Sequence, residues 1–166
     1  ILDFYKHIYG DYYQIGLDHS TVMYRYPKRK VPAVCLVSRE KETGKTTFTD
    51  FQKDFYGMNA TISSVERLLN NFNSIMQGKL VVVIEETRDE RGKVEETLKD
   101  LITNDKIIVE GKNKDSFQAA NYAKFYFNSN YPETFMKIKD NEDRYMVHKV
   151  KSVQKGKKNN KLHKLL

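Results

Sequence analysis

The segment from Val34 to Gly57 constrains the fold most, because an apolar run, a loop and a helical pattern follow one another in it. Residues 34–37 are apolar, the loop ends in Gly44-Lys45-Thr46, and phenylalanines then recur at helical spacing. This order predicts a strand, a phosphate-binding loop and a helix. In such a loop, backbone N–H groups and a lysine bind phosphate, while a hydroxyl holds a metal ion. Arg39 replaces the usual first glycine of G-x-x-x-x-G-K-[ST].

Length and composition are typical of one soluble domain. A chain of 166 residues can form one substantial core, and its start at Ile1 suggests a piece of a longer protein. The sequence contains no apolar stretch of about 18 residues, so we expect no membrane role. The single cysteine, Cys35, lies in an apolar run without a Cys or His partner nearby. We therefore expect a buried thiol, with neither a disulfide nor a zinc site.

The positive charge is concentrated at the C-terminus. The formal net charge is +7, and from Lys149 onward there are seven lysines and no acidic residue. The preceding part is therefore neutral, and residues 151–166 form a basic tail that we expect to be mobile. The tail is equally consistent with contact to phosphates and with continuation into a further part of the protein.

The remaining patterns predict alternating helices and strands. A short helix is predicted from Leu2, ending at Gly10, and another follows Ser63 or Ser64. The β-branched run 80–84 is typical of a strand buried on both faces, and apolar residues from Val94 to Ile102 predict an amphipathic helix. Further strands are predicted at 106–110, near Phe117, at 123–127 and at 144–150, the first two forming a β-hairpin with a basic tip.

This alternation predicts an α/β domain of three layers with a central, mainly parallel sheet. We divide the chain into an N-terminal helical or edge segment at 1–32, a core at 33–150 and the basic tail at 151–166. Ligands of such folds bind at the carboxyl ends of the strands.

Three predicted strand ends carry residues suited to nucleotide hydrolysis. Lys45 would contact the outer phosphates, and Thr46 would bind Mg²⁺ through its hydroxyl. After the buried strand come Glu85, which would hold the metal through water, and Glu86, which would polarise the attacking water. Asn130 would contact the outermost phosphate or that water without adding charge. The order of these signals along the chain makes a nucleotide site the favoured interpretation.

These residues resemble the motifs of superfamily 3 helicases, and most closely the helicase part of phage and plasmid primase-helicase or primase-polymerase proteins. Motif A is similar to residues 43–48, motif B to 80–86 and motif C to 125–130. Residues 98–106 and 109–115 resemble the additional B-prime element of that group. The resemblance covers roughly Tyr24 to Val150.

The resemblance implies a P-loop ATPase of AAA+ type that forms rings, usually hexamers, around single-stranded DNA. It implies ATP as the nucleotide and Mg²⁺ held by Thr46 and Glu85, and a loop binding the phosphates through Thr43, Gly44, Lys45, Thr46 and Thr47. It also implies an upstream primase or polymerase in the same full-length chain. The protein would act in the cytoplasm of the host of a phage or plasmid.

Two further sites follow from the resemblance, each with an open alternative. The hairpin tip Lys112, Asn113 and Lys114 would project into the channel and grip the DNA backbone, or it is a solvated turn. Arg144, the only arginine after motif C, would reach the neighbouring subunit's ATP site, or it pairs with Glu142 or Asp143.

Two departures from the family pattern keep other functions open. Arg39 replaces the first glycine of the loop, and Glu42 stands where close relatives often have glycine. An acid beside phosphates costs Coulomb energy, so slow turnover or weak affinity is consistent with this loop. The alternatives to a helicase are a module that binds nucleotide and DNA or mediates assembly with little hydrolysis, and a small-molecule P-loop kinase.

Overall fold

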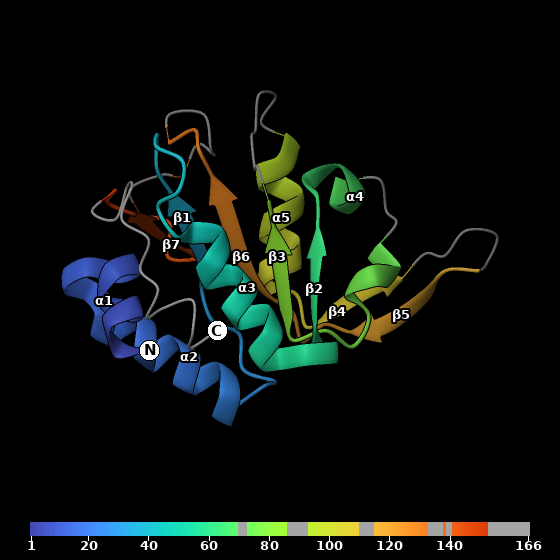
Figure 1. Ribbon diagram of the computed structural model, residues 1–166. Helices are drawn as coiled ribbons and strands as arrows, with labels where there is room; N and C mark the ends of the chain where they lie inside the picture. Colours follow the sequence, from blue (N-terminus) through green and yellow to red (C-terminus); the bar gives the residue numbers. More distant parts are fainter. Residues whose placement is uncertain (70–72, 86–92, 110–114, 133–137, 139–140, 153–166) are drawn as a thin grey trace.

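A five-stranded parallel sheet with helices on both faces forms the body of the domain (Figure 1). This computed structural model describes residues 1–69, 73–85, 93–109, 115–132, 138 and 141–152. Its elements are α1 (Leu2–Tyr9), η1 (Gly10–Tyr12), α2 (Tyr13–Arg25), β1 (Ala33–Val37), α3 (Lys45–Tyr56), η2 (Gly57–Asn59), β2 (Ala60–Ser63), α4 (Val65–Leu69), η3 (Asn73–Met76), β3 (Val81–Ile84), α5 (Lys93–Thr103), β4 (Lys106–Val109), β5 (Phe117–Ala120), β6 (Lys124–Ser129) and β7 (Tyr145–Lys149).

The order of the strands brings distant parts of the chain together. The sheet runs β2-β3-β6-β1-β7, and all four neighbouring pairs are parallel. Strand β6 therefore lies between β1 and β3, so the residues that follow these three strands meet at one edge of the sheet. The predicted α/β class with a mainly parallel sheet is confirmed, and the strands predicted from residues 34, 80, 123 and 144 onward are present.

Alternate residues of the central strands enter two separate cores. Val82, Ile84, Phe125 and Phe127 belong to a cluster with Leu98 and Ile102 of α5. Their neighbours in the strands belong to a second cluster with α1, α2 and α3. Figure 1 shows α5 behind the sheet and α3 in front of it. Successive side chains of a strand point to opposite faces of the sheet, and both faces are covered, so the apolar runs of these strands are continuous. The sheet and the helices on its two faces form the three predicted layers.

Most predicted helices are confirmed, whereas helix α2 and strand β2 were not predicted. Helix α3 ends at Gly57 and α1 ends at Gly10, as expected. The backbone N–H of Arg67 lies 3.4 Å from Ser64 Oγ, so Ser64 rather than Ser63 caps α4. Ser63 instead ends β2, an edge strand. Helix α2 occupies much of the region expected only to pack at the edge of the domain.

The predicted β-hairpin is confirmed as a separate two-stranded sheet. Strands β4 and β5 are antiparallel and project beyond the main sheet (Figure 1). Ile107 and Val109 belong to the core on the α5 side, whereas Ile108 is 61% exposed. The hairpin tip and the basic tail from residue 153 lie outside the described residues. Within the described part, no helix is long and apolar enough to cross a membrane.

Candidate functional site

The loop between β1 and α3 has the backbone of an anion-binding turn. Gly44 lies in the left-handed region, with a φ of 89°, and is the N-cap of α3. The first bond within the helix runs from the N–H of Phe48 to the carbonyl of Gly44. The N–H groups of residues 45–47 therefore have no partner inside the helix, and they lie at the positive end of its dipole. This arrangement suits a phosphate.

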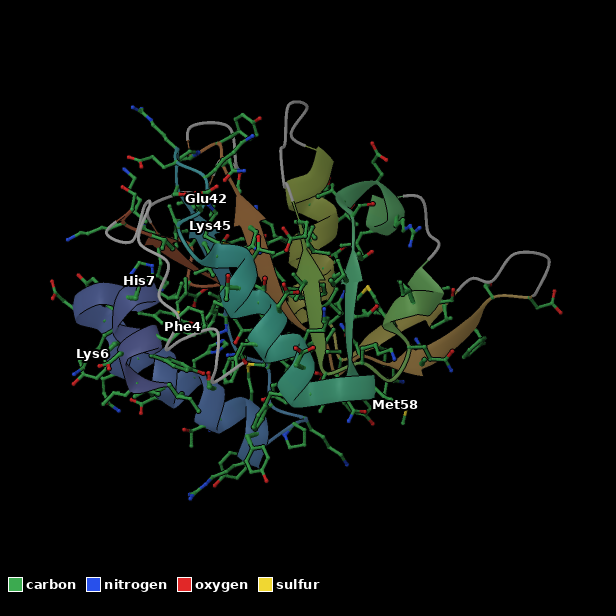
Figure 2. All side chains as sticks on the ribbon, in the orientation of Figure 1. Phe4, Lys6, His7, Glu42, Lys45 and Met58 are labelled. Carbon is green, nitrogen blue, oxygen red and sulfur yellow. The ribbon has the colours of Figure 1, made fainter. Side chains whose placement is uncertain are left out.

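Lys45 is buried in this loop, with 6% of its surface exposed (Figure 2). Its Nζ donates to Ser38 Oγ at 2.6 Å, to Thr43 Oγ1 at 3.2 Å and to Asn130 Oδ1 at 2.9 Å. Burial lowers the pKa of Lys45, and the charge of Glu85 opposes this shift. Three side-chain oxygens thus hold the buried ammonium group.

A second set of polar side chains connects α3 to the end of β3. Asn128, in β6, is 3% exposed, and its Nδ2 donates to Glu85 Oε1 and to Thr49 Oγ1, each at 2.9 Å. Thr49 Oγ1 in turn donates to the carbonyl of Thr46 at 3.0 Å. Asn128 therefore orients the Glu85 carboxylate toward the start of α3.

Residues from both sets line one cavity of about 220 Å³ at the carboxyl ends of the strands. The structure brings to it seven of the predicted site residues: Thr43, Gly44, Lys45, Thr46, Thr47, Glu85 and Asn130. Lys41, Glu42, Asn128 and Ser129 complete the lining. The predicted juxtaposition of three strand ends is therefore present, and the functional roles of these residues remain predictions.

The residues present fit a nucleotide phosphate and its magnesium ion. The free N–H groups of α3 and the Lys45 ammonium are donors for phosphate oxygens. Asn128 Oδ1 is buried without a hydrogen-bond partner in the described part of the chain, and Asn128 lines the cavity with Thr46 and Glu85. The Thr46 hydroxyl and the Glu85 carboxylate, which line the cavity, are oxygen ligands of the kind that Mg²⁺ binds while it retains waters.

Other predicted site residues lie apart from this cavity or outside the described residues. Arg144 precedes β7, at the amino end of the sheet, and it binds Glu142 through two contacts of 2.5 Å. This contact raises the pKa of the guanidinium and lowers the pKa of the Glu142 carboxyl. The ion pair considered from the sequence is therefore present. Glu86, Lys112, Asn113 and Lys114 lie outside the described residues.

Glu42 has an unusual backbone for its residue type. Its φ is 60°, and among the described residues it is the only non-glycine with a positive φ. This region favours glycine. The position at which the resemblance implies a glycine is thus one where the backbone is left-handed.

Four residues that shape the site were not predicted from the sequence. Asn128 is an amide inside an apolar strand, a signal that could have marked it as a buried polar residue with a specific role. Thr49 and Ser38 flank the loop without a motif of their own. His7 comes from α1, and its Nε2 lies 2.8 Å from the carbonyl oxygen of Thr43. Sequence spacing gives no indication of such a contact.

Comparison with known families places most of the chain in one family. Residues 36–145 match DUF5906, described as a family of unknown function. The matched range includes the loop, the end of β3 and Asn130. No curated protein matches the sequence.

Solved structures share the fold. The apo structure of the NrS-1 C-terminal region matches with a TM-score of 0.87 and 20% identity, over 99% of this chain and 42% of that one. The A form of the same apo region matches with a TM-score of 0.84 and 20% identity, over 99% of this chain and 41% of that one. JCV helicase with a bound acetamide compound matches with a TM-score of 0.55 and 16% identity, over 91% of this chain and 44% of that one. The chain thus spans less than half of each structure, and the likeness shows a shared fold.

Proposed function

The chain belongs to the DUF5906 family, and we propose that it is an ATP-hydrolysing motor domain that moves along single-stranded DNA. The observation that carries the proposal is the hydrogen bond from Lys45 Nζ to Asn130 Oδ1. These residues are 85 positions apart. From its own sequence context, Lys45 is predicted to contact the outer phosphates, and Asn130 the outermost phosphate or the attacking water. Their contact at the end of adjacent strands supports one shared nucleotide site.

In this proposal ATP occupies the cavity with its phosphates at the start of α3. The backbone N–H groups of residues 44–47 and the Lys45 ammonium bind the phosphate oxygens. Thr46 and Glu85 hold Mg²⁺, which when bound neutralises charge on the outer phosphates. Glu86 accepts a proton from the attacking water, and Asn130 orients that water toward the terminal phosphate. Asn128 keeps Glu85 in place through their 2.9 Å hydrogen bond.

DNA would bind at the projecting β4–β5 hairpin. The buried Ile107 and Val109 anchor β4 in the core, so the hairpin has a firm base. The tip would present Lys112, Asn113 and Lys114 to the DNA backbone. Contacts between lysines and phosphates do not depend on sequence, and they weaken as salt rises.

Hydrolysis would take place between subunits of a homo-oligomeric ring, a hexamer in our proposal. Arg144 would leave Glu142 and stabilise transition-state charge in the neighbouring subunit. The JCV helicase fold supports the motor role. The full-length protein would be a phage or plasmid replication protein with an upstream primase or polymerase, acting in the host cytoplasm.

A second candidate is a module that binds nucleotide and DNA or mediates assembly with little hydrolysis. Two observations favour it: Arg39 at the first glycine position, and the positive φ of Glu42 beside the phosphates. Such a module would bind Mg-ATP without appreciable turnover. A small-molecule kinase, the third candidate, would consume ATP only with an acceptor.

The deciding experiment measures ATP turnover and Mg-ATP affinity with and without single-stranded DNA. We expect DNA to stimulate turnover, Glu86→Gln to abolish hydrolysis, and Lys112→Ala with Lys114→Ala to remove stimulation while basal turnover persists. Binding without turnover would favour the assembly module. If DNA neither binds nor stimulates turnover, the motor proposal is wrong. Normal DNA binding by the double variant would disprove the assignment of the hairpin tip.

Arg144→Ala tests the assembly part of the proposal. In mixed oligomers, we expect turnover to rise with the number of interfaces at which a wild-type subunit supplies Arg144, because this arginine would act on the ATP site of the neighbouring subunit. Glu142→Gln, which removes the present partner of Arg144, is the matched control and should retain turnover. Failure of rescue in every mixture would exclude an action between subunits.

A further inference from the structure

We propose that His7 is a positioning residue of the phosphate loop, holding the peptide that follows Thr43 in the orientation that binds nucleotide. This inference rests on the proposed ATP site. His7 Nε2 lies 2.8 Å from the Thr43 carbonyl oxygen. A carbonyl oxygen only accepts, so Nε2 carries the hydrogen and donates it. The bond joins α1 to the loop across 36 residues of sequence.

The bonded peptide lies at the centre of the loop. Its carbonyl belongs to Thr43 and its N–H to Gly44, and in a trans peptide these two groups point in opposite directions. By fixing the carbonyl toward α1, His7 directs the Gly44 N–H away from that helix. Gly44 lines the cavity where we place the phosphates. His7 therefore determines which way one of the anion-binding N–H groups faces.

Thr43 also transmits this constraint to Lys45. The Thr43 side chain is 2% exposed, and its Oγ1 accepts a hydrogen bond from Lys45 Nζ at 3.2 Å. The residues on either side, Glu42 and Gly44, have φ values of 60° and 89°. Glycine adopts a positive φ without strain, but Glu42 carries a Cβ, so its left-handed conformation is costly for the loop to maintain alone. A bond from a separate helix offsets that cost.

Helix α1 is a firm support for His7. Phe4, Tyr5, Ile8 and Tyr9 are buried, and the Phe4, Tyr5 and Tyr9 rings contact Phe48 of α3 edge-on, with centroids 5.3 to 5.6 Å apart. A Cβ built on Gly44 would lie 3.5 Å from His7 Nε2 and 3.8 Å from Phe4. Figure 2 shows Phe4 and His7 on α1 beside the loop that carries Glu42 and Lys45. Helix and loop are thus in close contact.

A matched control exists in the same layer. His19 Nε2, on α2, bonds the carbonyl oxygen of Pro32 at 2.9 Å, before β1 rather than after it. Both histidines bond a main-chain carbonyl through the same ring nitrogen, but only His7 bonds the phosphate loop. Loss of His19 should therefore affect stability without a selective effect on nucleotide.

The test is the affinity of the purified chain for Mg-ATP, measured with a fluorescent ATP analogue beside thermal unfolding. We expect His7→Ala to weaken affinity about fivefold to tenfold, the loss of one hydrogen bond. His7→Gln, which retains a donor, should recover part of that loss. His19→Ala should lower the unfolding temperature and leave affinity within twofold. Wild-type affinity in a folded His7→Ala variant, or equal weakening by His19→Ala, would overturn the inference.

A second readout separates this inference from the proposed function. Failure of the wild-type chain to bind Mg-ATP would overturn the ATP site itself. The exchange rate of the Gly44 amide hydrogen then decides the role of His7. Faster exchange in His7→Ala but not in His19→Ala supports positioning of the loop, and equal rates contradict it.

Discussion

At the carboxyl ends of the strands, Lys45 and Asn128 bind other side chains, whereas at the amino ends Lys124 and Asn121 bind main-chain carbonyls. All four residues are at most 6% exposed. Lys124 Nζ donates to the carbonyls of Pro27 and Tyr122, and Asn121 Nδ2 donates to those of Leu101 and Asn104. A buried lysine and a buried asparagine thus hydrogen-bond main-chain carbonyls at the amino ends, whereas at the carboxyl ends the same residue types line a cavity.

The difference lies in what can replace each partner. A main-chain carbonyl that loses its buried donor has no alternative, so the bonds at the amino end favour a fixed structure. Side-chain hydroxyls and amides can rotate, so a phosphate can displace them from Lys45 at little cost to the backbone. Burial alone therefore does not distinguish a functional lysine from a structural one, but the type of its partners does.

The largest expected effect is that of Lys45→Ala on ATP turnover. Removing a buried cation from the phosphate site should lower turnover about 100-fold or more, because its charge is worth most where water is excluded. Lys124→Ala, the matched change at the other end, should retain turnover per folded molecule. Turnover and folded fraction measured on both variants test this. Equal losses of turnover would remove the distinction between the two ends.

A smaller effect is expected for Asn128→Ala. The variant loses the bond that orients Glu85, so turnover should fall about tenfold while Mg-ATP affinity changes little. Asn121→Ala is the control: it should lower the free energy of unfolding by about 1 to 3 kcal/mol, because carbonyls at the end of α5 lose their donor, and spare turnover. Steady-state kinetics and denaturant unfolding separate the two. Normal kcat in Asn128→Ala would contradict our account of Glu85.

Replacement of Glu42 should produce a change of only a few-fold, in the favourable direction. Glu42→Gln removes an exposed negative charge beside the phosphates, and we expect Mg-ATP affinity to rise about twofold to fivefold at low salt. Glu42→Gly also allows the positive φ without strain, so it should bind at least as tightly. The gain from either variant should shrink as salt rises. No gain from Glu42→Gln at low salt would show that the charge points away from the nucleotide.

The elements predicted well are those in which burial and sequence pattern agree. The β-branched run before Glu85 is buried, and so are Leu98 and Ile102 of α5, as their periodicity indicated. Helix α2 was missed because the residues it buries are Gly16, His19 and Met23, so its inner face lacks an apolar stripe. Strand β2 was missed because it has four residues, with Ile62 41% exposed.

The same reasoning explains what was found of the site. Lys45, Glu85 and Asn130 follow apolar runs, so the topology of a parallel sheet predicts that they meet. Asn128 lies within a strand, and its partners Glu85 and Thr49 are 43 and 79 positions away. The contact of His7 uses a backbone carbonyl, which every residue carries. Neither contact has a local pattern from which it could be predicted.

The smallest predicted effect concerns pH and the lysine at the amino end. Burial lowers the pKa of Lys124 from 10.5 to about 8, with a further contribution from the nearby charge of Lys30. Between these two values the unfolded chain binds more protons than the folded chain at this residue. Its contribution to the free energy of unfolding therefore rises as pH increases through this range, and it is constant below about 8.

Lys124→Met should remove this contribution. The stability difference between wild type and variant should therefore shift in favour of wild type from pH 8 to 9.5. Burial also raises the pKa of Cys35, so the folded chain retains a proton there, and near pH 9 this lowers the free energy of unfolding as pH rises. Cys35 is present in both proteins, so its contribution cancels in the stability difference between wild type and variant. Denaturant unfolding of both proteins at pH 8 and at pH 9.5 measures this stability difference. Lys28→Met, which replaces an exposed lysine, is the control. A difference independent of pH would mean that Lys124 keeps its proton in the fold, as a permanently charged partner of the two carbonyls.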